Sequence, residues 1–158
     1  MKLVPVLLLL ALPLIGQQKY DGPKPEKEDL PYIVQADNLI PTDAGRAKEQ
    51  KGKKDEITYT VSGPAAKART PLASPIFLLK TKEIVPEKIS LYRFEVKNGN
   101  REIMFRSGKR SKNPEPAHLN IRRLAEGLYR IEVSDSLSNG QYSLSPEGSN
   151  DVFCFEVF

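Results

Sequence analysis

Apolar and polar residues alternate in several short stretches of the chain. Ile57, Tyr59 and Val61 are separated by threonines, and the stretches 92–96 and 129–133 place arginine and glutamate between their apolar residues. Because side chains of a strand alternate between its two faces, this spacing predicts half-buried antiparallel strands. Further short runs fit the same pattern, at residues 32–36, 76–80, 102–106, 119–123, 141–144 and 152–157. We expect about nine strands and, beyond the N-terminal apolar run, no segment with the period of an ordinary helix.

Residues that favour tight turns separate these predicted strands. Asn98-Gly99 lies between the stretches 91–96 and 101–106, and this pair suits the positive φ angles of a two-residue hairpin turn. Glu126-Gly127 and Ser138-Asn139-Gly140 separate later strands, so the second half of the chain is expected to form a meander. Short alternating strands with closely spaced turns predict an antiparallel β-sandwich of immunoglobulin-like type, with a small closed barrel as the alternative.

The N-terminus has the layout of a secretory signal peptide. Lys2 precedes an apolar run from Leu3 to Ile15, and polar residues follow it. The run is shorter than the roughly 20 residues that span a bilayer, which predicts cleavage rather than a transmembrane anchor. We therefore expect a signal peptide over residues 1–17, a flexible leader rich in proline, lysine and glutamate over 18–29, and a single domain over 30–158. The mature protein is expected in the periplasm or outside the cell.

Two internal regions interrupt the alternation of apolar and polar residues. Residues 44–56 mix lysines with acidic residues and predict either a solvated strand pair or a loop. Residues 63–74 are rich in alanine, proline and lysine, which predicts a long connection.

Two short motifs carry a resemblance to known proteins. The segments GLYRI at 127–131 and GQYSL at 140–144 resemble the G-x-Y-x-hydrophobic strand entries of many bacterial extracellular β-sandwich modules. Residues 144–155 also resemble the ending of uncharacterised exported proteins from environmental bacteria. The resemblance implies an exported bacterial β-domain of immunoglobulin-like type, and it implies no activity, because those proteins have none assigned.

The few residues suited to catalysis or metal binding form no recognised motif. Cys154 is the only cysteine, so no internal disulfide can form, and its apolar neighbours predict a buried side chain. His118 is the only histidine, and the chain lacks the G-x-S-x-G motif of serine hydrolases. One cysteine and one histidine cannot complete a zinc site without carboxylates. We therefore expect no catalytic residue, metal or cofactor that the sequence alone can identify.

Acidic residues near one end of the predicted meander leave two other chemistries open. Asp135, Glu147 and Asp151 flank its loops and offer carboxylates for glycoside hydrolysis if folding pairs them. With Ser149 and Asn150 they also offer oxygen ligands for calcium, although their spacing matches no known calcium loop. The same residue types are what turns require, so solvated turns are the simpler interpretation.

Seven basic residues gather between positions 101 and 123 of a chain whose formal net charge is +4. Such a cluster suits contact with an acidic glycan, a lipid surface or another anionic envelope component, while a solvated loop without a function is the simpler interpretation. No aromatic residues are interleaved in its central loop, so specific recognition of nucleic acid is not expected. The candidate contact residues are Arg101, Arg106, Lys109, Arg110, Lys112, Arg122 and Arg123.

These observations favour a non-catalytic exported β-domain that binds an envelope protein, glycan or lipid surface, or that serves as an accessory module. The alternative is a hydrolase that acts on an extracellular polymer through carboxylates brought together by folding. An exposed apolar patch or an open sheet edge would favour the binding domain, whereas a cleft with two close acids would favour the hydrolase.

Overall fold

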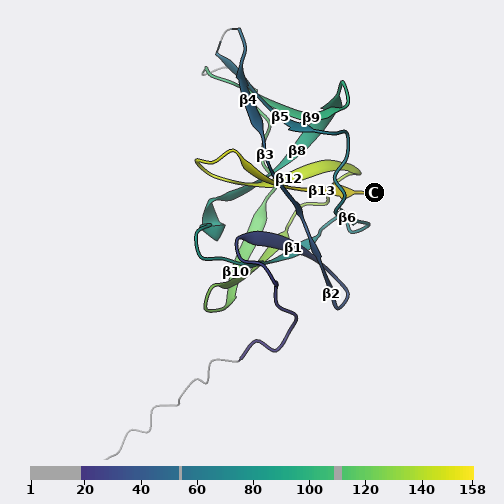
Figure 1. Cartoon of the computed structure of the whole chain (residues 1–158), viewed down its shortest axis with the longest axis vertical. Coiled ribbons are helices and arrows are strands. Elements are labelled where there is room, and N and C mark those ends of the chain that lie inside the picture. The colour runs from purple at the N-terminus through teal and green to yellow at the C-terminus, as the bar shows by residue number, and fades with distance from the viewer. Residues whose placement is uncertain (1–18, 54, 109–111) are drawn as a thin grey trace, which may run out of the picture.

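The computed structural model describes residues 19–53, 55–108 and 112–158, and these residues form an all-β fold. They contain thirteen strands in two sheets and one 3₁₀ helix, Pro86–Lys88. Figure 1 shows the strands and the extended N-terminal segment below them. The five-stranded sheet is antiparallel and consists, in spatial order, of β10 (Leu119–Ala125), β11 (Leu128–Val133), β7 (Ile76–Lys80), β1 (Leu30–Gln35) and β2 (Asn38–Pro41).

The second sheet curls into a half-barrel. Its spatial order is β3 (Asp43–Arg46), β13 (Asp151–Val157), β12 (Gly140–Pro146), β8 (Ile89–Lys97), β9 (Asn100–Arg106), β5 (Glu56–Ser62) and β4 (Lys48–Lys51). Only Ala47 separates β3 from β4 in the chain, so the first and last strands of this order belong to one continuous stretch. The remaining strand, β6 (Arg69–Thr70), is the single parallel addition and pairs with β13.

The larger hydrophobic core lies between the five-stranded sheet and one face of the half-barrel. Ile33 and Phe77 enter it from the five-stranded sheet, and Leu144 and Phe155 enter it from the half-barrel; all four are fully buried. The rings of Phe77 and Phe155 meet edge to face with centroids 5.0 Å apart, and Tyr142 stacks on Phe155 at 5.7 Å. The contact between Phe77 and Phe155 joins the two sheets across the core, whereas Tyr142 and Phe155 are partners on neighbouring strands of the half-barrel.

A second core fills the inside of the half-barrel. β13 contributes to both cores because its alternate side chains point to opposite faces. Phe153, Phe155 and Val157 face the larger core, as the sequence predicted, while Val152 and Cys154 face the second one. Strand β13 is therefore buried on both faces, although its sequence ends the chain.

Each of the nine predicted strand segments lies on a strand of the structure. The hairpin turn at Asn98-Gly99 is also confirmed, with φ angles of 50° and 74° at these two residues. The additional strands β2, β3, β4 and β6 are short. Two of them, β3 and β4, lie in the charged region 44–56, where β3 pairs with β13 and β4 pairs with β5.

The N-terminal end of the described chain is attached to the five-stranded sheet. The backbone N–H of Lys27 donates to the Tyr32 hydroxyl on β1, and Pro25 is buried. Glu28 forms ion pairs of 2.9 and 2.7 Å with Lys80 and Lys82. The predicted signal peptide, residues 1–17, lies outside the described residues. Within the described residues, no helix is long and apolar enough to cross a membrane.

Candidate functional site

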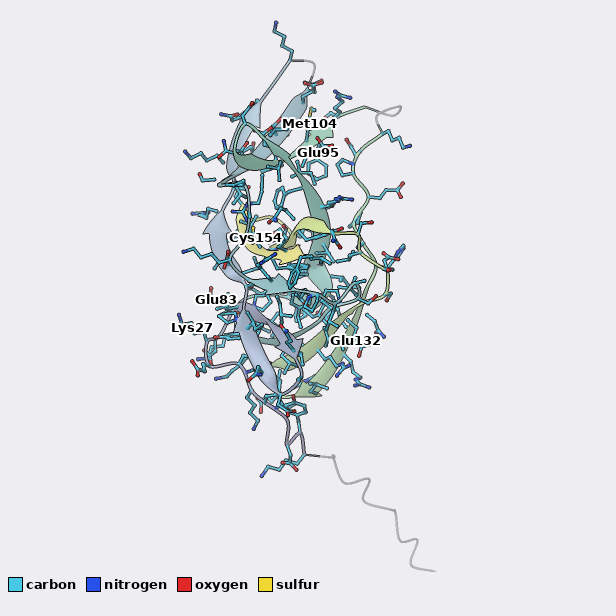
Figure 2. All side chains as sticks on the ribbon, turned by 90° about the vertical axis from the view of Figure 1, so that its right-hand side faces the viewer. Lys27, Glu83, Glu95, Met104, Glu132 and Cys154 are labelled. Carbon is cyan, nitrogen blue, oxygen red and sulfur yellow. The ribbon has the colours of Figure 1, made fainter. Side chains whose placement is uncertain are left out.

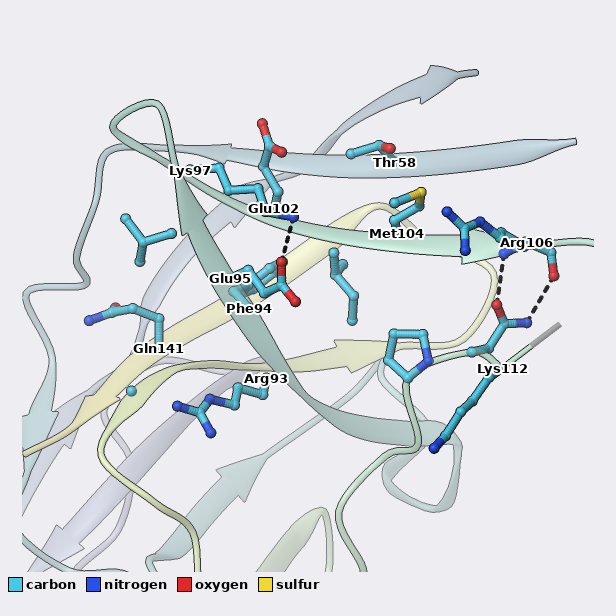
Figure 3. A pocket seen from close by; sticks show the side chains of 15 residues that line it. Thr58, Arg93, Phe94, Glu95, Lys97, Glu102, Met104, Arg106, Lys112 and Gln141 are labelled. Carbon is cyan, nitrogen blue, oxygen red and sulfur yellow. Dashed lines mark hydrogen bonds and ion pairs between the residues drawn. The ribbon is translucent and has the colours of Figure 1, made fainter. Parts of the chain in front are cut away.

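Strand β8 changes its partner along its length, and this change opens the half-barrel. Residues 89–94 pair with β12, whereas residues 95–97 pair with β9. Beyond Glu102, β9 remains paired with β5 but leaves β8. The hairpin therefore opens into a gap between β8 and the end of β9, which we call the fork and which Figure 3 shows from close by.

The fork forms a cavity of about 950 Å³ on the outer face of the half-barrel. Its walls come from β8, β9, Thr58 on β5, the start of β12 and the segment Lys112–Pro114. Asn113 closes its wide end, because its side-chain amide accepts a hydrogen bond from the Arg106 N–H at 2.7 Å and donates one to the Arg106 carbonyl at 2.9 Å. Met104 and Glu95, which face this cavity, lie toward one end of the molecule in Figure 2, with Cys154 near the middle.

A second cavity, of about 510 Å³, lies on the inner face of the half-barrel. Three partly exposed aromatic residues line it, and we call it the aromatic hollow. The Phe105 ring meets Tyr59 at 6.0 Å and Tyr92 at 5.4 Å between centroids, both edge to face. The buried side chains of Phe94 and Ile103 form its floor.

The rim of the aromatic hollow is polar and carries a net negative charge. Glu87, Glu147 and Asp151 supply three carboxylates and Lys88 one cation to its lining. Two of the carboxylates have exposed cationic partners: Glu147 lies 3.7 Å from Lys88, and Asp151 lies 3.3 Å from Arg46. The rim thus offers oxygen acceptors around an aromatic floor.

The negative charge extends to the Tyr59 side of the half-barrel. Glu49 on β4 pairs in register with Tyr59 on β5. Burial, together with the Glu49 carboxylate, raises the pKa of Tyr59 above its ordinary value. The Tyr59 hydroxyl also shares a side-chain hydrogen bond with Glu49, so its single donor is directed toward that carboxylate.

The predicted basic cluster is divided between separate parts of the molecule. Arg106 and Lys112 both line the fork cavity, where Arg93 and Lys97 join them. Arg122 and Arg123 lie instead on β10, at the edge of the five-stranded sheet and at the opposite end of the view in Figure 1. Lys109 and Arg110 fall outside the described residues.

Arg101 differs from the other described residues of the cluster because its side chain points into the half-barrel. It is only 6% exposed, and its guanidinium donates to the carbonyls of Ser62 at 2.9 Å and Gly63 at 3.0 Å. Arg101 lies on the same face of β9 as Ile103, which packs in the second core. Two of its nitrogens thus bind backbone carbonyls beside that core, while among the described residues its buried Nη1 has no hydrogen-bond partner.

Cys154 is buried in the second core, as its apolar neighbours predicted. It is 1% exposed, and burial raises the pKa of its thiol despite the opposing effects of Arg101 and Ser143. A protonated, inaccessible thiol is a poor nucleophile, which agrees with a structural role.

The three acids predicted near one end of the meander do not meet in one cleft. Glu147 and Asp151 both line the aromatic hollow. Asp135 lies elsewhere, where it accepts hydrogen bonds from the backbone N–H of His118 at 2.7 Å and contacts the His118 ring at 3.1 Å. The backbone N–H and the side chain of His118 lower the pKa of Asp135.

No metal centre can be assigned within the described residues. None of their histidine, cysteine, aspartate and glutamate side chains gather in a group of three or more that could hold a metal ion. The chain also matches no known family model, no curated protein and no solved structure. The geometry of the half-barrel is therefore the basis for proposing a function.

Proposed function

We propose that this chain is an exported, non-catalytic β-domain of the envelope or extracellular space that binds its ligand in the aromatic hollow. The observation that carries the proposal is the group Tyr59, Tyr92 and Phe105, which stays partly exposed above an apolar floor. Ligand sites are typically concave, about 300–1,000 Å³ in volume and lined by aromatic residues with a few polar groups. The aromatic hollow meets each of these conditions.

The finer architecture that we propose is an immunoglobulin-like sandwich with an extension. The five-stranded sheet and the strands β8, β12 and β13 form the two layers, since their inner faces share the larger core. The strands β4, β5 and β9 extend one layer beyond the sandwich and curl it into the half-barrel. In this proposal the sandwich is the rigid support and the extension carries the site.

The ligand we favour is a sugar unit of a neutral extracellular glycan. A sugar ring offers a C–H face to an aromatic surface and hydroxyl groups to surrounding acceptors, which suits Tyr92 and Phe105 within a rim of carboxylate and serine oxygens. An acidic glycan or anionic lipid suits this hollow less well, because three carboxylates against one cation repel it. The ion pairs of Glu147 and Asp151 with exposed cations are weak, so these carboxylates can still accept hydrogen bonds from sugar hydroxyl groups.

Glu87, Glu147 and Asp151 also keep the hydrolase as a second candidate, because they place carboxylates around one cavity. We favour binding over hydrolysis because Glu147 and Asp151 each have an exposed cationic partner and lie at the rim of the hollow rather than at its apolar floor. Those surroundings do not desolvate a carboxyl group as a general acid requires.

Titration of the purified chain with cello-, xylo- and chito-oligosaccharides tests both candidates. The chain contains no tryptophan, so tyrosine fluorescence can report on the hollow. We expect saturable binding of one oligosaccharide that Tyr92→Ala weakens at least tenfold, whereas Tyr20→Ala, a tyrosine of the N-terminal segment, leaves it unchanged. Shortened sugar products would favour the hydrolase, and equal affinities of the two variants would contradict the proposed site.

A further inference from the structure

Two strand edges face each other across the fork without pairing. The ladder between β8 and β9 includes Glu95 with Glu102, Val96 with Arg101 and Lys97 with Asn100, and it ends there. Had it continued, Arg93 would pair with Met104. The fork thus exposes a piece of the edge of β9 and a piece of the edge of β8 to the same cavity.

The direction of the backbone groups follows from the alternation of an antiparallel ladder. In a strand, the N–H and C=O of successive residues point to opposite neighbours. The Arg106 N–H and C=O point toward the fork, where Asn113 binds both. The Ser107 N–H points the other way and donates to Asp55 beside β5, at 3.2 Å. Met104 is two residues from Arg106, so its N–H and C=O also point toward the fork.

The same reasoning applies to the opposite side of the fork. The Leu91 carbonyl accepts a hydrogen bond from the Ala117 N–H at 2.9 Å, which shows that Leu91 directs its backbone away from β12. Arg93 is two residues further along β8 and therefore directs its N–H and C=O toward Met104. An inserted strand would find hydrogen-bonding groups on both sides, between the positions already filled by Asn113 and Ala117.

The side chains around the fork indicate what such a strand should carry. Met104 is 36% exposed on the outer face of β9, so an apolar side chain of an incoming segment would cover surface that is now in water. Four cations and two carboxylates line the cavity, which gives it a positive balance. The four cations are Arg93, Lys97, Arg106 and Lys112.

Among the described residues, Arg93 and Lys112 have no carboxylate partner, unlike the other two cations. Lys97 pairs with Glu95 at 2.5 Å and Arg106 with Glu56 at 2.8 Å. The Arg93 guanidinium donates instead to the Asn139 carbonyl at 3.1 Å and lies 6.0 Å from the centre of the Tyr142 ring. Carboxylates on an incoming segment would complement this charge.

We propose that the fork accepts a short, extended, acidic segment of a partner protein as an added strand between β8 and β9. Its backbone pairs with Met104 on one side and with Arg93 on the other, which is the β-augmentation mode of peptide recognition. An apolar side chain of the segment covers Met104, and its carboxylates lie beside Arg93 and Lys112. This site is separate from the aromatic hollow and does not depend on the glycan proposal.

A labelled peptide tests the strand pairing directly. The probe is a fluorescein-labelled hexapeptide of sequence Glu-Val-Thr-Val-Glu-Val, and fluorescence anisotropy measures its binding to the full chain. Two peptides serve as controls: one with lysine in place of each glutamate, and one with N-methyl groups on alternate residues, which removes donors along one edge. We expect each control to bind at least tenfold more weakly than the acidic probe.

Variants at Met104 test the same contact from the protein side. Met104→Pro removes the N–H that points into the fork but no hydrogen bond to β5, so we expect at least a tenfold loss of affinity with a folded protein. Met104→Leu keeps the N–H and the apolar side chain and should bind as the original does. If Met104→Pro fails to melt cooperatively, the N-methylated peptide on the unaltered chain gives the same information.

Other outcomes would overturn the proposal. Absence of binding at millimolar probe, or equal affinity for the N-methylated and unmodified peptides, would exclude strand pairing. Equal affinity for polyglutamate and for anionic phospholipid vesicles would show a general anionic contact instead. Hydrogen exchange gives an independent criterion: saturating probe should slow exchange of the Met104 and Arg93 amides, and Tyr92→Ala should leave this protection unchanged.

Discussion

Asp29 anchors the start of the first strand, and its replacement by asparagine tests that role. One carboxylate oxygen, Oδ1, accepts hydrogen bonds from the backbone N–H groups of Lys82, Glu83 and Ile84 at 3.0–3.1 Å and lies 2.6 Å from the Thr81 hydroxyl. Asp29 also has a positive φ of 55°, which asparagine tolerates well. The substitution Asp29→Asn therefore keeps the shape and the acceptor oxygen and removes only the charge.

The size of the effect follows from the difference between charged and neutral hydrogen bonds. A bond to a charged group contributes about 1.5–3 kcal/mol and a neutral one about 0.5–1.5 kcal/mol. The donors around Asp29 share one oxygen, and the carboxylate is partly exposed. We therefore expect Asp29→Asn to lower the unfolding free energy by about 1–2 kcal/mol rather than by the sum over all bonds. Asp29→Ala leaves the three N–H groups without their acceptor and should cost about 3 kcal/mol.

The pH dependence provides a second criterion for the same residue. Burial raises the pKa of Asp29, but the hydrogen bonds from Thr81 and from the backbone outweigh it and hold that pKa below its ordinary value. A carboxyl group with a lowered pKa stabilises the fold fully above the unfolded-state pKa of about 3.9 and loses that effect as pH falls through its folded-state value. The difference between the original and Asp29→Asn should therefore be constant from about pH 5 to 8 and shrink below about pH 4.

Urea unfolding followed by far-UV circular dichroism at several pH values measures these differences. The reasoning would be refuted if Asp29→Asn changed the unfolding free energy by less than about 0.3 kcal/mol at pH 7, since that is below the expected effect of even one charged bond. A difference that persisted unchanged in acid would also refute it, because it would not come from the ionised carboxylate.

Two further predictions concern β13. Phe155→Ala removes a fully buried ring and should reduce the unfolding free energy by about 3–5 kcal/mol, whereas Phe158→Ala, at a residue 49% exposed and lying 4.3 Å from the Arg69 guanidinium, should cost about 0.5–1 kcal/mol. Urea titrations that gave similar losses for both would contradict the placement of the core. The Cys154 thiol should not react with Ellman's reagent in the native protein and should react fully in concentrated urea, and rapid native reaction would contradict its burial.

The all-β fold could be predicted because most of the predicted strands have one face in a core and alternate accordingly, although β13 is buried on both faces. The Asn98-Gly99 turn could be predicted because its backbone requirement is local. Strands β3 and β4 are different: β4 is fully exposed and rich in charge, so its pairing with β5 leaves no period-two signal. β3 depends on its long-range partner β13, whereas β4 pairs with the neighbouring β5.

The candidate sites were harder to predict because they depend on which strands separate. Arg106 and Lys112 were expected to act together with Arg122 and Arg123, but the chain between them crosses from the half-barrel to the five-stranded sheet. The inward direction of the Arg101 side chain could have been predicted from the sequence, because Arg101 shares one face of its strand with the apolar residues Ile103 and Phe105. The fork itself could not be predicted, because the sequence of a hairpin does not reveal where its two strands separate.

The fork and the aromatic hollow have a common physical origin in the double role of β8. Its first half is held by β12 against the larger core, while β9 follows β5 around the half-barrel, so the hairpin cannot remain paired along its full length. Phe94 and Ile103 lie at this separation and line both cavities. A substitution at either of them would alter both cavities, so its effect could not distinguish the two proposed binding sites. Tyr92 lines only the hollow and Met104 only the fork, and for this reason variants of these two residues can distinguish ligand binding on the inner face from strand addition on the outer one.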